Sequence, residues 1–163
     1  IEGEFDFKIK EVNNLKIIQT GRQESAQEMI YQFNFTTEEL IKKTGPNYLV
    51  DLGKIIEKQA KIEADELARD YNVYFDFARS FKHRIVFEVP KGYQVQGLDK
   101  FNQKVESKIG GFTSAARQEG SKIIIETNKH YDANFASKNQ WKDIVNLLNA
   151  ANTFTEQKIL LKR

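Results

Sequence analysis

The sequence predicts a mainly β domain: an antiparallel β-sandwich with a short helix near residues 37–43 and a longer helix near residues 138–151 packed on it. Three observations lead to this prediction. Apolar and polar side chains alternate along several stretches, which is the pattern of strands with one face on a core and one in water. Turn-forming residues separate these stretches. Only two short segments carry the capping signals of helices.

The strand predictions rest on an apolar residue at every second position. In residues 83–89, Ile85, Phe87 and Val89 lie opposite the charged Arg84 and Glu88, and His83 is expected to face the apolar side as a partly buried residue. The predicted strands fall within residues 4–10, 29–35, 71–81, 83–89, 122–129 and 158–163. The predicted turns are Asn13-Asn14, Pro90–Gly92, Gly110-Gly111 and Glu119–Ser121, and Pro90–Gly92 is interpreted as a structural corner.

Two capping boxes predict the helices. Thr36-Thr37-Glu38-Glu39 opens the short helix, which Gly45-Pro46 ends. Ser137–Gln140 opens the longer helix, and an apolar stripe with helical spacing follows it, from Trp141 to Ala151. Trp141 lies on this stripe, so we expect it in the core rather than in a binding site.

Residues 47–70 are ambiguous, because they fit a strand at the start and an amphipathic helix later. We expect a strand first and an irregular or helical part after it. The length of 163 residues predicts a single β-rich module over residues 1–163, with a possible subdivision near residues 80–84.

Composition excludes several functions. The formal net charge is only +2, so no nucleic-acid partner is predicted. The absence of cysteine excludes thiolate metal sites and a cysteine nucleophile. No apolar run reaches the length of a membrane span. The chain begins at Ile1 and its single methionine is Met29, so we expect a processed chain or a piece of a longer one.

No catalytic motif is visible. The only histidines are His83 and His130, and the pair His130 and Asp132 is too small a set for a metal site. The sequence has no GxSxG motif, and Gly110-Gly111 lacks the spacing of a phosphate loop. We therefore predict no catalytic residues, no metal and no cofactor. A hydrolase that uses two carboxylates, such as Asp65 and Glu66, ranks last among the alternatives.

Aromatic residues are the best candidates for binding. Tyr74 lies on the polar face of its predicted strand, Tyr93 follows the Pro90–Gly92 turn, and Tyr131 ends the strand that begins near Lys122. Exposed rings on a β-sandwich can stack on sugars. The alternative, which we favour at each position, is a tyrosine that buries its ring and keeps its hydroxyl in water.

Three stretches carry a family resemblance. Residues 85–98, 104–131 and 140–163 resemble the C-terminal region, a domain of unknown function, of exported transglutaminase-like proteins of Bacteroidetes. The resemblance extends upstream through residues 17–25, 45–54 and 68–81 and so covers essentially the whole chain. In that family a β-rich domain and a transglutaminase-type core precede this region. Without a cysteine, the chain inherits no catalytic residue from the core.

The resemblance implies a non-catalytic accessory domain, periplasmic or at the cell surface. It would pack against the upstream transglutaminase-like domain or present substrate to it, and we expect it to leave an apolar patch exposed. The alternative is an independent module that binds a glycan or a peptide.

Overall fold

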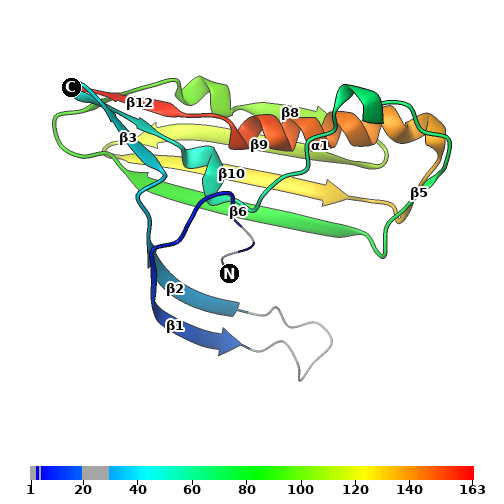
Figure 1. Ribbon diagram of the computed structural model, residues 1–163, viewed down its shortest axis with the longest axis horizontal. Helices are drawn as coiled ribbons and strands as arrows, with labels where there is room; N and C mark the ends of the chain where they lie inside the picture. Colours follow the sequence, from blue (N-terminus) through cyan, green and yellow to red (C-terminus); the bar gives the residue numbers. More distant parts are fainter. Residues whose placement is uncertain (1–2, 4, 20–29) are drawn as a thin grey trace.

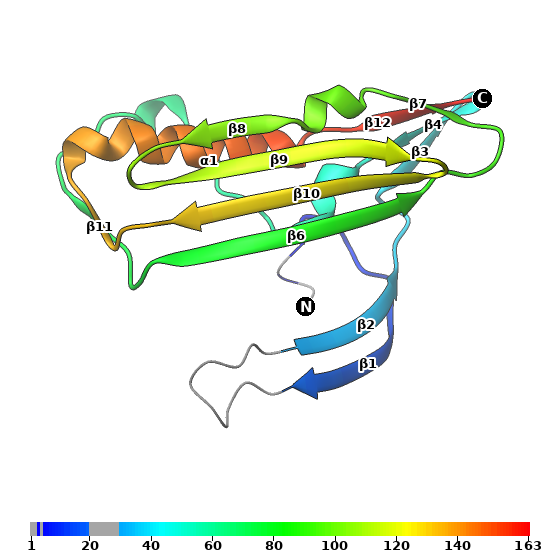
Figure 2. The same cartoon turned by 180° about the vertical axis from the view of Figure 1, so that it is seen from behind.

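The computed structural model describes residues 3, 5–19 and 30–163 of the chain. These residues form mainly antiparallel sheets and one C-terminal helix, so the predicted fold class is confirmed. One layer is a long sheet, and the layer across it contains the helix and a smaller sheet (Figure 1). A two-stranded hairpin lies beside these layers (Figure 2).

The long sheet has the strand order β6-β10-β9-β8. Its strands are β6 (Arg79–Glu88), β10 (Lys122–Tyr131), β9 (Gly110–Glu119) and β8 (Gln103–Glu106). β6 and β10 contain two of the predicted strands. The turn predicted at Gly110-Gly111 is wrong, because these glycines begin β9. Gly110 lies so close to β10 that a side chain there would collide with the backbone of His130.

The smaller sheet has the order β3-β4-β12-β7. Its strands are β3 (Ile41–Thr44), β4 (Asn47–Val50), β12 (Ile159–Lys162) and β7 (Gln94–Gln96). β7 follows the turn at Pro90–Gly92, where the Tyr93 amide donates to the Pro90 carbonyl at 3.3 Å and Gly92 has a φ of 90°. The corner predicted there is confirmed. Side chains of both sheets and of the helix share one apolar core.

The C-terminal helix confirms the prediction for residues 138–151 and extends it. A single 3₁₀ turn, η4 (Lys138–Gln140), leads into α1 (Trp141–Thr155), and the Ser137–Gln140 capping box is formed. Trp141 is buried, as the apolar stripe predicts, and its indole donates to the Glu66 carbonyl at 3.0 Å. Within the described part of the chain, no helix has the length and apolar character needed to cross a membrane.

The short helix predicted near residues 37–43 is wrong. A bend occupies residues 38–40 and β3 follows. The capping residues are used by tertiary contacts instead: the Thr37 hydroxyl donates to the Lys8 carbonyl at 2.8 Å, and the Lys8 amide donates to a Glu39 carboxylate oxygen at 3.0 Å. The Leu40 carbonyl accepts from the Asp51 amide at 2.8 Å, so it is not free for a helix.

The N-terminal hairpin pairs β1 (Glu11–Gln19) with β2 (Ile30–Thr36). The alternation predicted for residues 29–35 gives a row of neighbouring rings: Tyr31 stacks on Phe33 with ring centres 5.9 Å apart, and Phe33 lies tilted to Phe35 at 6.1 Å. Met29 lies outside the described residues. Asn13-Asn14 forms an irregularity inside β1 rather than a turn, and Asn14 has a φ of 56°.

Two predicted strands are shorter or absent. Residues 5–9 are not a strand; Phe5 and Phe7 pack their rings on Phe35. Residues 71–81 divide into the short β5 (Val73–Tyr74), which pairs with β11 (Phe135–Ala136), and the start of β6. The expectation for residues 47–70 is confirmed, since β4 precedes the 3₁₀ turns η1 (Leu52–Ile55) and η2 (Ala64–Glu66) and irregular backbone. Residues 80–84 lie within β6, and the single-module organisation stays a prediction.

Candidate functional site

A cavity of about 380 Å³ opens on the inner face of the long sheet. Its floor comes from β6, β9 and β10, and one wall comes from residues 56–59, which cross the sheet after η1. β2 of the hairpin contributes Tyr31. The lining residues are Tyr31, Ile56, Glu57, Lys58, Gln59, Phe81, His83, Phe112, Thr127 and Lys129.

Strand alternation explains why polar groups reach this cavity. Ile123 and Ile125 of β10 are fully buried in the core, and Thr127 and Lys129 continue the same face. The register places His83 of β6 opposite Thr127. The face of the sheet therefore changes from apolar to polar along one strand, where residues 56–59 cover it.

His83 joins the sheet to the covering segment. Its Nδ1 lies 3.2 Å from the Thr127 hydroxyl and its Nε2 lies 2.9 Å from a Glu57 carboxylate oxygen. The hydrogen bond with His83 lowers the pKa of Glu57, and burial of the carboxylate opposes this effect. Because its pKa is lowered, Glu57 stays a carboxylate at pH values below its usual titration range.

The contacts from the Thr127 hydroxyl to the His83 imidazole to the Glu57 carboxylate follow the same order as in a hydrolytic triad. Thr127, however, is buried in the middle of β10, which pairs with β6 on one side and β9 on the other. The backbone amides around Thr127 are used by these pairings, so they are not free to stabilise an oxyanion. This geometry favours a binding or structural role for the three side chains.

Lys129 is the partly buried cation of the cavity, and Lys58, which also lines it, is exposed. The Lys129 Nζ donates to the Gln59 side-chain oxygen at 2.8 Å and lies 5.6 Å from the centre of the Tyr131 ring. Phe81 and Phe112 are its cross-strand neighbours. Burial, and secondarily the charge of Arg79, lowers the pKa of Lys129 to about 8. At neutral pH this amine is charged but poorly solvated.

A wider depression, of about 720 Å³, lies over β6, β8, β9 and β10 and includes Lys82 and Arg84. There Arg84 lies 3.5 Å from Glu126, and Arg117 lies 2.8 Å from the same carboxylate. Because Glu126 already pairs with both arginines and the depression is more open than the cavity around Lys129, that cavity is the better candidate site.

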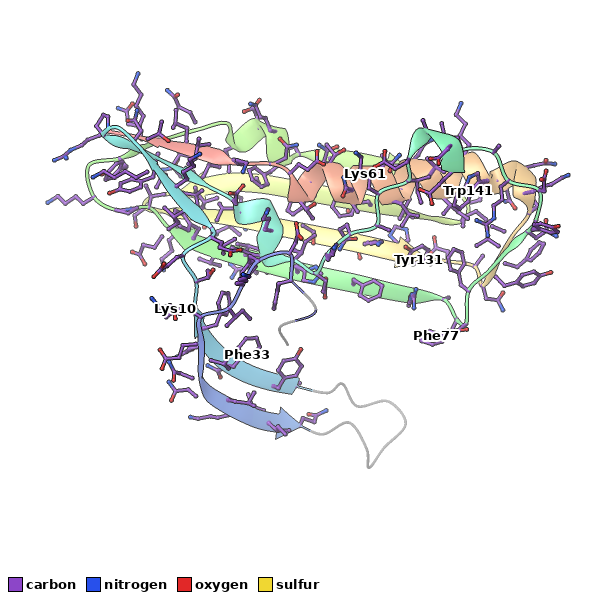
Figure 3. All side chains as sticks on the ribbon, in the orientation of Figure 1. Lys10, Phe33, Lys61, Phe77, Tyr131 and Trp141 are labelled. Atoms are coloured by element: carbon purple, nitrogen blue, oxygen red, sulfur yellow. The ribbon has the colours of Figure 1, made fainter. Side chains whose placement is uncertain are left out.

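The three tyrosines predicted for binding do not form one site. Tyr74 is 74% exposed, and its ring lies 5.1 Å from that of Phe135. Tyr93 is half-buried beside Tyr48 and packs on the main core. Tyr131 is only 5% exposed, so its ring is not available for stacking on a sugar. Figure 3 shows Tyr131 and Phe77 at the end of the long sheet that lies far from the chain's C-terminus.

The pair His130 and Asp132 gains a third neighbour in the structure. His130 Nε2 lies 3.4 Å from a Glu106 oxygen and 3.5 Å from an Asp132 oxygen. Both carboxylates approach the same nitrogen, which is the geometry of an ion pair. Among the described residues, no group of three histidines or carboxylates is arranged to hold a metal ion.

Sequence reasoning missed Glu57, Gln59 and Lys129 as site residues. Glu57 and Gln59 fall in the ambiguous stretch 47–70, whose path over the sheet has no local signal. Lys129 had a signal that could have found it: the residues Ile123, Ile125, Thr127 and Lys129 share one face, so the alternation carries a charged side chain onto an apolar face.

The comparisons with known proteins give one family. The model of DUF3858, a domain of unknown function, matches residues 48–161, which include all strands of the long sheet, α1 and the residues of the cavity except Tyr31. Neither the curated proteins nor the solved structures contain a match to the chain. Since the match covers more than half of its residues, the chain belongs to the DUF3858 family of domains of unknown function.

Proposed function

We propose that this chain is a non-catalytic accessory module of an exported transglutaminase-like protein, in the periplasm or at the cell surface. It packs against the upstream transglutaminase-like domain or presents substrate to it. The observation that carries the proposal is the apolar surface of the β1–β2 hairpin. The resemblance of the sequence to the C-terminal region of such proteins supports the partner.

Six large apolar or aromatic side chains among the described residues of the hairpin are exposed to solvent. Leu15 is 55% exposed and Ile17 is 62% exposed; Val12, Ile18, Ile30 and Tyr31 are exposed as well. Two-stranded hairpins are marginally stable in water, and exposed apolar patches of this kind mark interaction sites. A partner that covers the hairpin would stabilise it and would bury its exposed apolar side chains.

The hairpin lies outside the DUF3858 match, which begins at residue 48. It is therefore an addition on the N-terminal side of the family unit, the side on which the proposed partner domain lies. Figure 2 shows the hairpin below the two packed layers, connected to them at one end. This position suits contact with a neighbouring domain.

Hydrogen exchange tests the proposal. The amides of β1 and β2 are expected to exchange slowly in the longer protein and quickly in the isolated chain, because the partner domain covers the hairpin. Ile17→Ser should abolish the protection in the longer protein and change the free energy of unfolding of the isolated chain by less than about 0.5 kcal/mol.

Val86→Ser is the matched control, because Val86 is an exposed apolar residue on β6, outside the hairpin. It should leave the protection intact. Equal exchange of β1 and β2 in the two proteins, or a native gene that encodes no transglutaminase-like domain upstream, would reject the proposal.

A second candidate is glycan or peptide binding by the exposed aromatic side chains on and near the small β5–β11 sheet. Tyr74 and its neighbour Phe135 are both exposed, and Tyr71 near them is 80% exposed. Tyr74→Ala should weaken binding to any glycan that a screen identifies by about tenfold, the loss expected when one stacked ring is removed. Leu67→Ala, at another exposed apolar position, should have no effect. Equal titration curves for the two variants would reject this candidate.

A further inference from the structure

Lys129 carries a charge that the described residues leave without a carboxylate partner. Its hydrogen-bond partner is the neutral amide of Gln59, and no carboxylate among the described residues lies within 4.0 Å of its Nζ. The Glu57 carboxylate attracts the Lys129 ammonium from outside ion-pair distance, but its short contact is with His83 at 2.9 Å. A poorly solvated ammonium that is only partly compensated is costly, so the cavity favours the arrival of a negative charge.

A second cation strengthens this preference. The Arg79 guanidinium lies 5.5 Å from the centre of the Tyr131 ring, and Lys129 Nζ lies 5.6 Å from the same centre. Arg79 has ring contacts but no ion pair among the described residues. Arg79 does not line the cavity, but its positive charge repels that of Lys129, and an anion bound beside Lys129 would offset this repulsion.

The remaining walls favour an organic ligand over an inorganic ion. Phe81, Phe112 and Ile56 line the cavity with apolar surface. The volume of about 380 Å³ falls in the range of sites for small organic molecules. Gln59 and His83 supply hydrogen-bonding groups beside the cation.

We propose that this cavity binds an organic carboxylate, with Lys129 as the group that holds the carboxylate and the aromatic wall as the seat of its apolar part. The carboxylate can come from a free small acid or from the C-terminus of a peptide. The inference does not depend on the accessory role proposed above, since the cavity lies almost entirely within the DUF3858 unit.

Titration followed by amide chemical shifts tests the proposal. The probes are 3-phenylpropionate and its neutral amide, together with a tripeptide that ends in phenylalanine as the free acid and as the amide. The two acids should shift the amides of residues 57–59, 83 and 127–129, and the two amides should not. Binding should weaken above pH 8, where Lys129 loses its proton.

Three variants make the result specific. Lys129→Met should weaken acid binding about tenfold or more, as expected for loss of a hydrogen bond to a charged group. Lys129→Arg should keep most of the affinity because it keeps the charge. Lys122→Met removes an exposed lysine at the other end of β10 and should change nothing. Thermal unfolding of each variant confirms that it is folded.

Tighter binding of the peptide acid would assign the carboxylate to a chain end, and tighter binding of phenylpropionate would assign it to a small acid; both results support the proposal. Equal binding of acids and amides, equal losses in Lys129→Met and Lys122→Met, or the absence of shifts with all four probes would overturn it.

Discussion

Replacement of Phe154 by alanine is expected to lower the free energy of unfolding by about 3–5 kcal/mol. Phe154 is 0% exposed and lies near the C-terminal end of α1. Its ring meets Phe101 at 5.5 Å and Phe112 at 5.7 Å, both in edge-on arrangements. Truncation removes these contacts and leaves a cavity between α1 and the long sheet.

Urea unfolding followed by circular dichroism measures this loss. Phe77→Ala is the matched control, because Phe77 is 61% exposed and its truncation should change the unfolding free energy by less than about 0.5 kcal/mol. A loss below about 1 kcal/mol for Phe154→Ala would show that α1 does not pack on the long sheet as described.

Lys129→Met is expected to stabilise the fold by about 1–3 kcal/mol at pH 7. The pKa of Lys129 falls from 10.5 in the unfolded chain to about 8 in the fold, because burial disfavours the charged amine. Between these two values the unfolded chain binds more protons, so the stability of the natural protein rises with pH there. Below pH 8 the full penalty is present, and methionine does not carry it.

The pH dependence of the difference is the decisive measurement. The gain from Lys129→Met should be full below pH 8 and should shrink to nothing as pH rises to about 10.5. Lys122→Met, at an exposed position of β10, should show no such trend. A variant that is less stable than the natural protein at both ends of this range would contradict the description of Lys129 as a poorly solvated cation.

Strong local patterns predicted the body of the fold. β6, β10 and α1 follow from alternation or helical spacing over many consecutive residues, and each pattern agrees with the burial that the structure gives. The prediction of a short helix near residues 37–43 failed because residues distant in sequence form hydrogen bonds with its capping groups. Thr36–Glu39 fits a capping box, but the Thr37 hydroxyl and the Glu39 carboxylate form hydrogen bonds with the backbone of Lys8 instead.

The site was less predictable than the fold. Tyr131 lies at the end of an alternating strand, and the sequence alone does not show whether another segment covers its ring. In the structure Phe75 packs on it, with ring centres 4.9 Å apart. Glu57 meets His83 only because residues 56–59 cross the sheet. Such contacts join residues far apart in sequence, and no local period records them. Of the three tyrosines, Tyr74 keeps its predicted binding role, because its ring is exposed.

The two boundaries of the family match meet in space. Tyr48 of β4 and Leu161 of β12, where the match begins and ends, are directly paired in the smaller sheet. Chains can accept inserted domains and can be circularly permuted where the two ends of a unit lie side by side. The chain therefore enters and leaves the DUF3858 unit at the same place, the β4–β12 pair. The unit could be inserted into another chain while the segments on either side of it stay neighbours.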